Sequence, residues 1–354
     1  MSAEADEPRA VTLEELQGWI GQAHDFAGAD DVSKSDIRRK LEVYCFDCPL
    51  HYDDEVARAH GYRGLVAPVA MTPLWAMPAY WRPGDPVLYR PGVREQAGGI
   101  RTDVPVPAAY TGGVNTATQW EYFEPLYPGD ALHGNWRLVE IKPRETRLGD
   151  GVFVTVEATI YKRSGELVAK NRNTHYRFTP KQAASREKTD EPRASAARAE
   201  TPGAAAPTSE PADWSGQLRF ADVAAGDEVP PYSMWLSYQR IVMSVAADRM
   251  FSGLHHNRDT ASGRGFADII FNTRGWEMLF ETVLRRWIGL DGRIRKLGPF
   301  RMTGSSYPGD VVTAQARVVE KTQSPDDALV KVELLALNDR GEAGRGEAQV
   351  ALPA

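Results

Sequence analysis

The feature that most constrains the fold of this chain is an internal repeat. The stretch DCPLHYDDEVARAHGYRG begins at Asp47, and SGLHHNRDTASGRGF begins at Ser252. When His51 is aligned with His255, both stretches have Ala six residues after the His, Gly ten after and an aromatic residue eleven after. A chain with such a repeat is expected to contain two copies of one structural unit.

The regions that follow the two histidines also correspond. Tyr-Pro-Gly-Asp occurs at 127–130 and again at 307–310, and Pro-Gly at its centre predicts a type II turn that leads into a strand. Further along, alternating apolar and polar residues flank Arg-Ser-Gly-Glu at 163–166 and Asp-Arg-Gly-Glu at 339–342. This pattern predicts a β-hairpin in each half.

Helical spacing marks a long helix before the strands of the second half. Apolar residues between 272 and 289 recur every three or four positions, and Gly289 is a suitable C-terminal stop. The counterpart at 69–80 contains Pro73 and Pro78, which should shorten or kink it. A helix followed by antiparallel strands, present twice, indicates an α+β fold whose two sheets pair edge to edge.

A segment of different composition divides the two halves. Residues 181–213 contain no aromatic residue and no Leu, Ile or Val, so they cannot bury enough apolar area to offset the entropy of ordering. We expect a disordered linker there, between an N-terminal domain at 1–180 and a C-terminal domain at 214–354. The capping box Thr12-Leu-Glu-Glu15 predicts a short helix near the N-terminus.

Composition narrows the class of protein. The 354 residues carry a formal net charge of −6, which argues against a nucleic-acid or acidic-membrane binder. No apolar run approaches the roughly 20 residues of a membrane helix, and the acidic N-terminus does not resemble a signal peptide. With two cysteines, a disulfide framework is excluded. We expect a cytoplasmic enzyme or binding protein without a membrane partner.

The repeated motifs resemble those of the MaoC-like (R)-specific enoyl-CoA hydratases and FAS1-like dehydratases. The motifs are Asp47–His51, Asp53–Ala59 and Gly61–Pro68 in the first half, and His255–Asp259, Gly265–Thr273 and Tyr307–Asp310 in the second. The resemblance covers both halves and implies a tandem (double) hot-dog fold, in which an antiparallel sheet wraps a long helix in each half.

The resemblance also implies a hydro-lyase that hydrates a trans-2-enoyl-CoA or dehydrates an (R)-3-hydroxyacyl-CoA or -ACP, without a cofactor or metal. In the family, an Asp five residues before a His manages the protons, and an amide near the start of the long helix polarises the thioester carbonyl. Such chemistry requires a general acid and base and a stabilised enolate oxygen. The resemblance also allows a homodimer or association with another hot-dog subunit.

Neither half keeps the family spacing of the Asp and the His. In the first half Asp47 lies four residues before His51, and in the second half Asp248 lies seven before His255. A one-residue shift is easier for a loop to absorb, which favours the Asp47/His51 pair. Family members usually retain activity in the second half, which favours His255 with Asp248. Both pairs therefore remain candidate catalytic residues.

Four more residues are candidates for substrate binding, namely Gly64, Trp75, Asn257 and Asn272. Trp75 belongs to an aromatic group that either lines a bulky pocket or packs in the core. Cys45, Cys48 and His51 have spacing that would also allow a zinc site, although buried free thiols are common.

Two other functions remain open. One is a hot-dog thioesterase that uses a helix carboxylate, Glu277 or Glu281. The other is a non-catalytic acyl-CoA-binding subunit that needs a partner to supply the missing Asp.

Overall fold

The computed structural model of the chain describes residues 11–87, 104–146, 148–180, 211–324 and 328–354. Its α-helices are α1 Leu13–Gln17, α2 Lys34–Tyr44, α3 Asp54–Ala59, α4 Thr72–Trp75, α5 Tyr238–Ala247, α6 Arg258–Gly263 and α7 Thr273–Ile288. Its 3₁₀ helices are η1 Pro49–His51, η2 Val69–Met71, η3 Phe220–Asp222 and η4 Gly253–His255. Within these ranges, no helix has both the length and the apolar character that a bilayer crossing requires.

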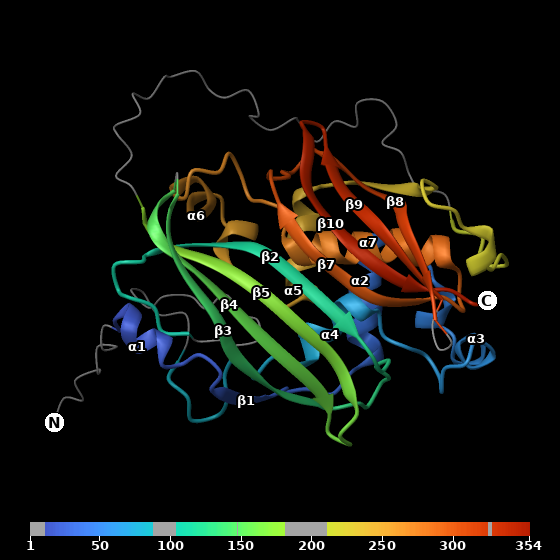
Figure 1. The fold of residues 1–354 in the computed structure, drawn as a ribbon, viewed down its shortest axis with the longest axis horizontal. Coiled ribbons are helices and arrows are strands. Elements are labelled where there is room, and N and C mark those ends of the chain that lie inside the picture. Colours follow the sequence, from blue (N-terminus) through green and yellow to red (C-terminus); the bar gives the residue numbers. More distant parts are fainter. Residues whose placement is uncertain (1–10, 88–103, 147, 181–210, 325–327) are drawn as a thin grey trace.

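Ten strands form one antiparallel sheet in the order β1-β3-β4-β5-β2-β7-β10-β9-β8-β6 (Figure 1). Their bounds are β1 Ala23–Ala27, β2 Gly112–Tyr122, β3 Leu132–Thr146, β4 Gly149–Lys162, β5 Leu167–Pro180, β6 Glu228–Trp235, β7 Arg293–Met302, β8 Val311–Gln323, β9 Ala328–Asn338 and β10 Gly341–Ala351. Strands β2 and β7 pair at the centre, with Thr118 opposite Phe300 and Glu121 opposite Lys296. The predicted edge-to-edge joining of two sheets is thus confirmed.

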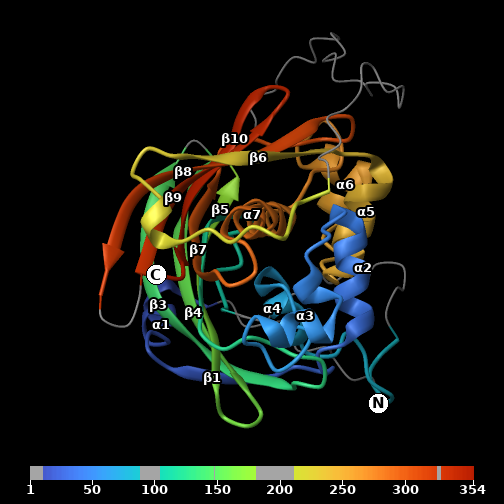
Figure 2. The same ribbon diagram turned by 90° about the vertical axis from the view of Figure 1, so that its right-hand side faces the viewer.

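The sheet wraps α7, and the helices α2 and α5 lie on the side of α7 away from the sheet (Figure 2). Trp276, Leu279 and Phe280 of α7 are at most 1% exposed, so the helix is enclosed as a core element. The apolar spacing between 272 and 289 therefore predicted this helix correctly, and Gly289 is its C-cap with a positive φ of 68°.

The first half has only a short equivalent of α7. There, η2 and the four-residue α4 stand where the long helix would begin, and Pro73 lies in the first turn of α4. The sequence anticipated a shortened helix at 69–80, and the regular helix ends at Trp75.

Local motifs of the repeat adopt the predicted geometry. In both Tyr-Pro-Gly-Asp turns the Asp amide donates to the Tyr carbonyl, and Gly129 and Gly309 have φ values of 91° and 93°. Such φ values suit the third position of a type II turn, which requires Gly or Asn. The capping box between Thr12 and Glu15 also forms, with both reciprocal hydrogen bonds.

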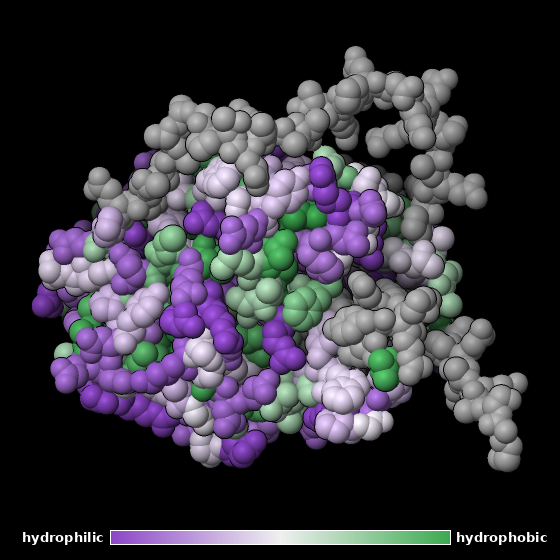
Figure 3. Space-filling model, turned by 180° about the vertical axis from the view of Figure 1, so that it is seen from behind, coloured by the Kyte–Doolittle hydropathy of each residue, from purple (hydrophilic) through white to green (hydrophobic). Residues whose placement is uncertain are grey.

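The helical side of the molecule is mixed in character. Seen from behind, hydrophobic residues are interspersed with strongly hydrophilic ones (Figure 3). Val242 and Met243 of α5 are among the exposed large hydrophobic residues. The predicted linker at 181–213 falls mostly on residues 181–210, which lie outside the described ranges.

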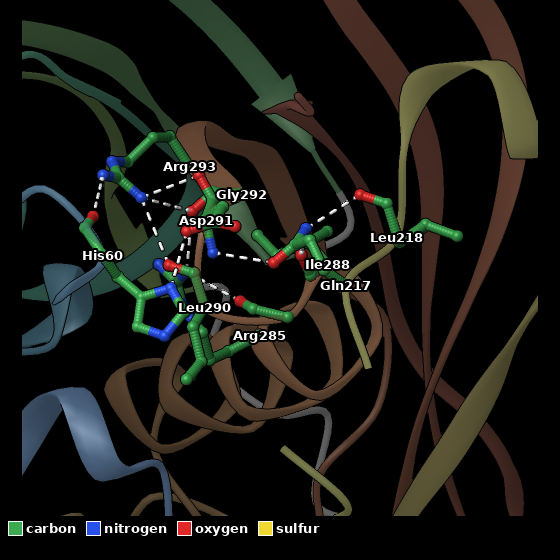
Figure 4. A network of polar contacts seen from close by, with 10 residues as sticks. His60, Gln217, Leu218, Arg285, Ile288, Leu290, Asp291, Gly292 and Arg293 are labelled. Carbon is green, nitrogen blue, oxygen red and sulfur yellow. Dashed lines mark hydrogen bonds and ion pairs between the residues drawn. The ribbon is translucent and has the colours of Figure 1, made fainter. Parts of the chain in front are cut away.

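The turn after α7 is tied to the first half by Arg293 (Figure 4). The Arg293 guanidinium donates to the His60 carbonyl at 3.0 Å and to the Asp291 carbonyl at 2.8 Å, and it stacks on the Tyr62 ring at 4.1 Å. The His60 ring also contacts the Asp291 carboxylate at 2.6 Å. This joint fixes the C-terminal end of α7 against the helix α3.

We expect the Arg293→Met variant to lose about 2 to 3 kcal/mol of unfolding free energy, because several hydrogen bonds from a charged donor and a cation–π contact disappear. The matched control is Arg301→Met on the same strand, where the side chain is exposed and a change within about 0.5 kcal/mol is expected. Urea unfolding measures both variants. Equal stability of the two would contradict a joint at Arg293.

Candidate active site

The two histidine loops are built alike. His51 and His255 are 204 residues apart (255 − 51), and each lies at the end of a 3₁₀ turn, η1 or η4. Just after each preceding helix, one residue has a positive φ: Cys45 at 49° after α2 and Arg249 at 53° after α5, and these positions again differ by 204. Two non-glycine residues in this conformation, at equivalent positions, turn the chain into each loop in the same way.

The same hydrogen bond fixes both imidazoles. His51 Nδ1 lies 2.7 Å from the Val66 carbonyl oxygen, and His255 Nδ1 lies 2.8 Å from the Ile270 carbonyl oxygen. Because a carbonyl oxygen can only accept, Nδ1 carries the proton in each neutral ring. The Nε2 atom of each ring therefore holds a lone pair that can accept a proton.

His51 is sealed in the core of the first half. Its side chain is 3% exposed, it packs edge-on against Phe46, and its Nε2 has no partner among the described residues. Burial lowers the pKa of His51 to about 3, so the ring is neutral over the physiological range.

Asp47 is directed toward other partners. One of its carboxylate oxygens accepts from the Ala212 amide at 3.0 Å, and the other lies 3.9 Å from Arg286. Among the described residues, no hydrogen bond or ion pair connects Asp47 with His51. Asp47 and His51, proposed as a pair from their spacing, thus have different partners in the described part of the chain.

The helix start of the first half is occupied by a carboxylate from the second half. Glu281 of α7 is fully buried, and its two oxygens accept from the amides of Val69 and Ala70, each at 2.8 Å. Burial raises the pKa of Glu281 to about 7, although the two amides favour the ionised form. Sequence reasoning considered Glu281 only as a thioesterase carboxylate and did not anticipate this contact.

His255 has a more open environment in the second half, with its side chain partly buried. Burial lowers the pKa of His255, while the carboxylate of Asp248 acts in the opposite direction. Asp248 itself is 7% exposed and forms an ion pair at 2.5 Å with Nζ of Lys40, which is 1% exposed.

Lys40 comes from the first half and was not among the residues predicted for the site. A sequence signal for it exists, because Lys40 lies on the helical stripe of Ile37, Leu41 and Tyr44, all of which are buried. A lysine on an apolar stripe is a buried cation that needs a partner.

The start of α7 is rich in hydrogen-bond donors. The Asn272 side-chain oxygen accepts from the Gly275 amide at 2.8 Å, so Asn272 is the N-cap. Within the described ranges, no acceptor is bound to the amides of Thr273 and Arg274, nor to the buried side-chain nitrogens of Asn272 and Trp276. Such a cluster at the N-terminus of a 16-residue helix is suited to a carbonyl oxygen that gains negative charge.

The other predicted binding residues have local roles in the structure. A Cβ at Gly64 would lie 2.9 Å from the Asp54 carboxylate, which accepts from the Leu65 amide. Asn257 is the N-cap of α6 and accepts from the Thr260 amide. Trp75 is 1% exposed, and its indole nitrogen contacts Asp36 at 3.3 Å.

The two cysteines are poorly suited to bind a metal ion together. Cys45 is exposed while Cys48 is buried, and burial raises the pKa of the Cys48 thiol to about 12. A zinc ligand must be a thiolate, which this environment disfavours. In the ranges that the structure describes, no group of three or more His, Cys, Asp or Glu side chains could hold a metal ion.

Known proteins resemble this chain in sequence and in fold. The family model of the FAS1-like dehydratase domain region matches residues 19–171. The chain is 33% identical over 171 residues to a probable enoyl-CoA hydratase alpha subunit of Thermomonospora curvata, a match that covers 47% of this chain and 51% of that protein. It is 28% identical over 154 residues to the 3-oxo-4,17-pregnadiene-20-carboxyl-CoA hydratase alpha subunit of Mycobacterium tuberculosis, covering 43% of this chain and 46% of that protein.

The chain thus spans about half the length of these two curated relatives. Among solved structures, a MaoC-like dehydratase matches with a TM-score of 0.70 at 20% identity, covering 96% of this chain and 100% of that one. A Mycobacterium tuberculosis protein described as having a double hotdog fold matches with a TM-score of 0.58 at 13% identity, covering 94% of this chain and 96% of that one. The chain has the double hot-dog fold, and residues 19–171 are similar in sequence to the FAS1-like dehydratase region.

Proposed function

We propose that this protein is a hydro-lyase that adds water to a trans-2-enoyl-CoA, or removes water from a 3-hydroxyacyl thioester, and that its second half carries the reactive groups. The observation that carries this proposal is the contrast between the helix starts. The amides of Thr273 and Arg274 in α7 have no acceptor among the described residues, whereas those of Val69 and Ala70 in η2 are bound to Glu281. The names of the relatives support the reaction class.

The surroundings of His51 argue against a working site in the first half. A thioester carbonyl would have to displace the Glu281 carboxylate from Val69 and Ala70. The imidazole that would act on it is 3% exposed. The first half therefore serves as the structural partner, and in this proposal residues 1–180 form that domain and residues 214–354 the catalytic domain, joined by 181–213.

The second half offers the groups that hydration needs. His255 donates to the Ile270 carbonyl, two residues before the N-cap of α7, so the imidazole is anchored close to the free amides. Its lowered pKa keeps the ring neutral, and a neutral ring with a free Nε2 can act as a general base.

In the proposed hydration, His255 first accepts a proton from water and later returns it to the substrate. His255 Nε2 takes a proton from water while the water oxygen bonds to C3, and the C2=C3 π electrons move into the thioester carbonyl. The amides of Thr273 and Arg274 stabilise the enolate oxygen that forms. The imidazolium returns its proton to C2, which gives the 3-hydroxyacyl thioester. The Asp248 carboxylate favours the transient imidazolium by its opposite charge.

The thioesterase alternative has less support. It requires a free carboxylate on α7, but Glu281 is bound to two amides and Glu277 pairs with Arg274 at 2.9 Å. One observation supports the alternative of a non-catalytic subunit: none of the described residues places a carboxylate in hydrogen-bond contact with His255. Relatives named hydratase alpha and beta subunits make a second hot-dog chain the kind of partner to test.

The His255→Gln variant should lose at least about a hundredfold in kcat/KM for crotonyl-CoA or a bulkier enoyl-CoA, because the general base is removed. The matched control is His51→Gln at the equivalent position of the repeat, which should stay within about threefold once its melting temperature confirms folding. Loss of enoyl absorbance measures both variants. A reversed result, with activity lost only in His51→Gln, would move the site to the first half.

A stability prediction follows from the raised pKa of Glu281. Its pKa rises from 4.5 to about 7 on folding, so the folded chain binds this proton more tightly than the unfolded chain. Between those values the unfolded chain has already released the proton, and the free energy of unfolding therefore falls as pH rises. The Glu281→Gln variant has no carboxyl group to titrate at this position. The free energy of unfolding of the wild type, measured relative to this variant, should therefore drop by roughly 2 to 3 kcal/mol between about pH 5 and pH 8.

Urea unfolding at the two pH values tests this prediction. The control is Glu228→Gln, whose exposed side chain should leave the pH dependence of the wild type intact. If Glu281→Gln and the wild type lose stability in parallel over this range, Glu281 is not the titrating group.

A further inference from the structure

Lys40 and Asp248 form an ion pair that neither half could make alone. Lys40 lies on α2 of the first half, Asp248 caps α5 of the second, and the Nζ–Oδ2 distance is 2.5 Å. Both side chains are buried. Burying two charges is costly, and a packed neutral pair is often as stable, so such a pair calls for a reason beyond stability.

The repeat supplies that neutral pair for comparison. With the offset of 204, Lys40 corresponds to Ser244 and Tyr44 corresponds to Asp248. The helices α2 and α5 cross so that Tyr44 contacts Ser244 at 2.7 Å while Lys40 contacts Asp248. Each contact therefore joins the same two positions of the repeat, one from each half, and the halves that supply them are exchanged between the two contacts, as at a two-fold interface. The Tyr44–Ser244 contact is neutral and the Lys40–Asp248 contact is charged, although the two occupy equivalent places in the repeat.

The charged contact lies on the side of the second histidine. Asp248 opens the loop that carries His255, and its charge acts on the His255 imidazole. The other charged or titratable groups that act on Lys40 are Arg274 and Glu277 at the start of α7, and its ammonium also faces the Tyr44 ring at 5.0 Å. Lys40 therefore stands between the end of α5 and the start of α7.

We infer that Lys40 is a positioning residue, supplied by the first half, that keeps the Asp248 carboxylate ionised and oriented for the site around His255. This inference rests on the hydro-lyase function proposed above. It gives the first half a defined task in catalysis, because the single site is then shared by both halves. The neutral Tyr44–Ser244 contact has no such task.

Removing the ammonium has a direct chemical consequence. A buried carboxylate without its cation is destabilised and takes up a proton more readily. A protonated Asp248 can no longer favour the imidazolium on His255. In the Lys40→Met variant, the acid limb of the kcat/KM profile should therefore move to higher pH.

The experiment compares Lys40→Met, Lys40→Arg and the control Tyr44→Phe, which alters the equivalent neutral contact. We expect Lys40→Met to lose about tenfold or more in kcat at neutral pH with KM within about threefold, and its acid limb to rise by about one pH unit. Lys40→Arg keeps the charge and should restore the position of the acid limb. Tyr44→Phe should keep the wild-type profile.

A double-mutant cycle separates positioning from general damage. In an Asp248→Asn background, Lys40→Met should cause no further loss of kcat, because Lys40 acts through Asp248. This double variant carries no unpaired buried charge, so it can be measured even if Lys40→Met alone folds poorly. An equal loss in both backgrounds, or an unshifted acid limb in Lys40→Met, would overturn the inference.

Failure of the proposed function can be told apart from failure of this inference. If the wild type hydrates no enoyl-CoA, the function fails, but the carboxyl carbon of Asp248 can still be followed by carbon-13 NMR, with Asp248→Asn as the assignment control. Proton uptake by Asp248 should occur at higher pH in Lys40→Met than in the wild type. Identical titrations would show that Lys40 does not hold this carboxylate.

Discussion

The pairing of β2 with β7 is the contact on which the rest of the structure depends. It joins two five-stranded sheets into one and leaves no exposed edge between them. It also brings the helices of the two halves together. The helix α2 packs against α5, and Glu281 of α7 binds the amide of Val69 at the start of η2. In this arrangement, Lys40 of the first half reaches Asp248, and Glu281 of the second half reaches Val69 and Ala70.

The two halves share a plan but differ in what occupies their helix starts. In the first half, Glu281 fills the amides of Val69 and Ala70 and His51 is enclosed. In the second half, the amides of Thr273 and Arg274 have no protein acceptor among the described residues, and His255 is partly accessible. A duplicated fold thereby provides one candidate site and one supporting copy.

The sequence predicted the parts whose causes are local. The type II turns at 127–130 and 307–310 follow from Pro and Gly, and α7 follows from its apolar spacing. The contacts of the site could not be predicted this way, because Lys40 meets Asp248 across 208 residues and Glu281 meets Val69 across 212. The position of Asp47 also escaped prediction, since its partner Ala212 lies 165 residues away, at the end of the predicted linker.

The most direct test of the proposed site is a structure of the protein with a non-hydratable enoyl-CoA analogue. We predict that the thioester oxygen lies at the amides of Thr273 and Arg274, with the β-carbon facing His255 Nε2. A thioester bound at Val69 and Ala70, with Glu281 displaced and His51 opened to the ligand, would contradict it.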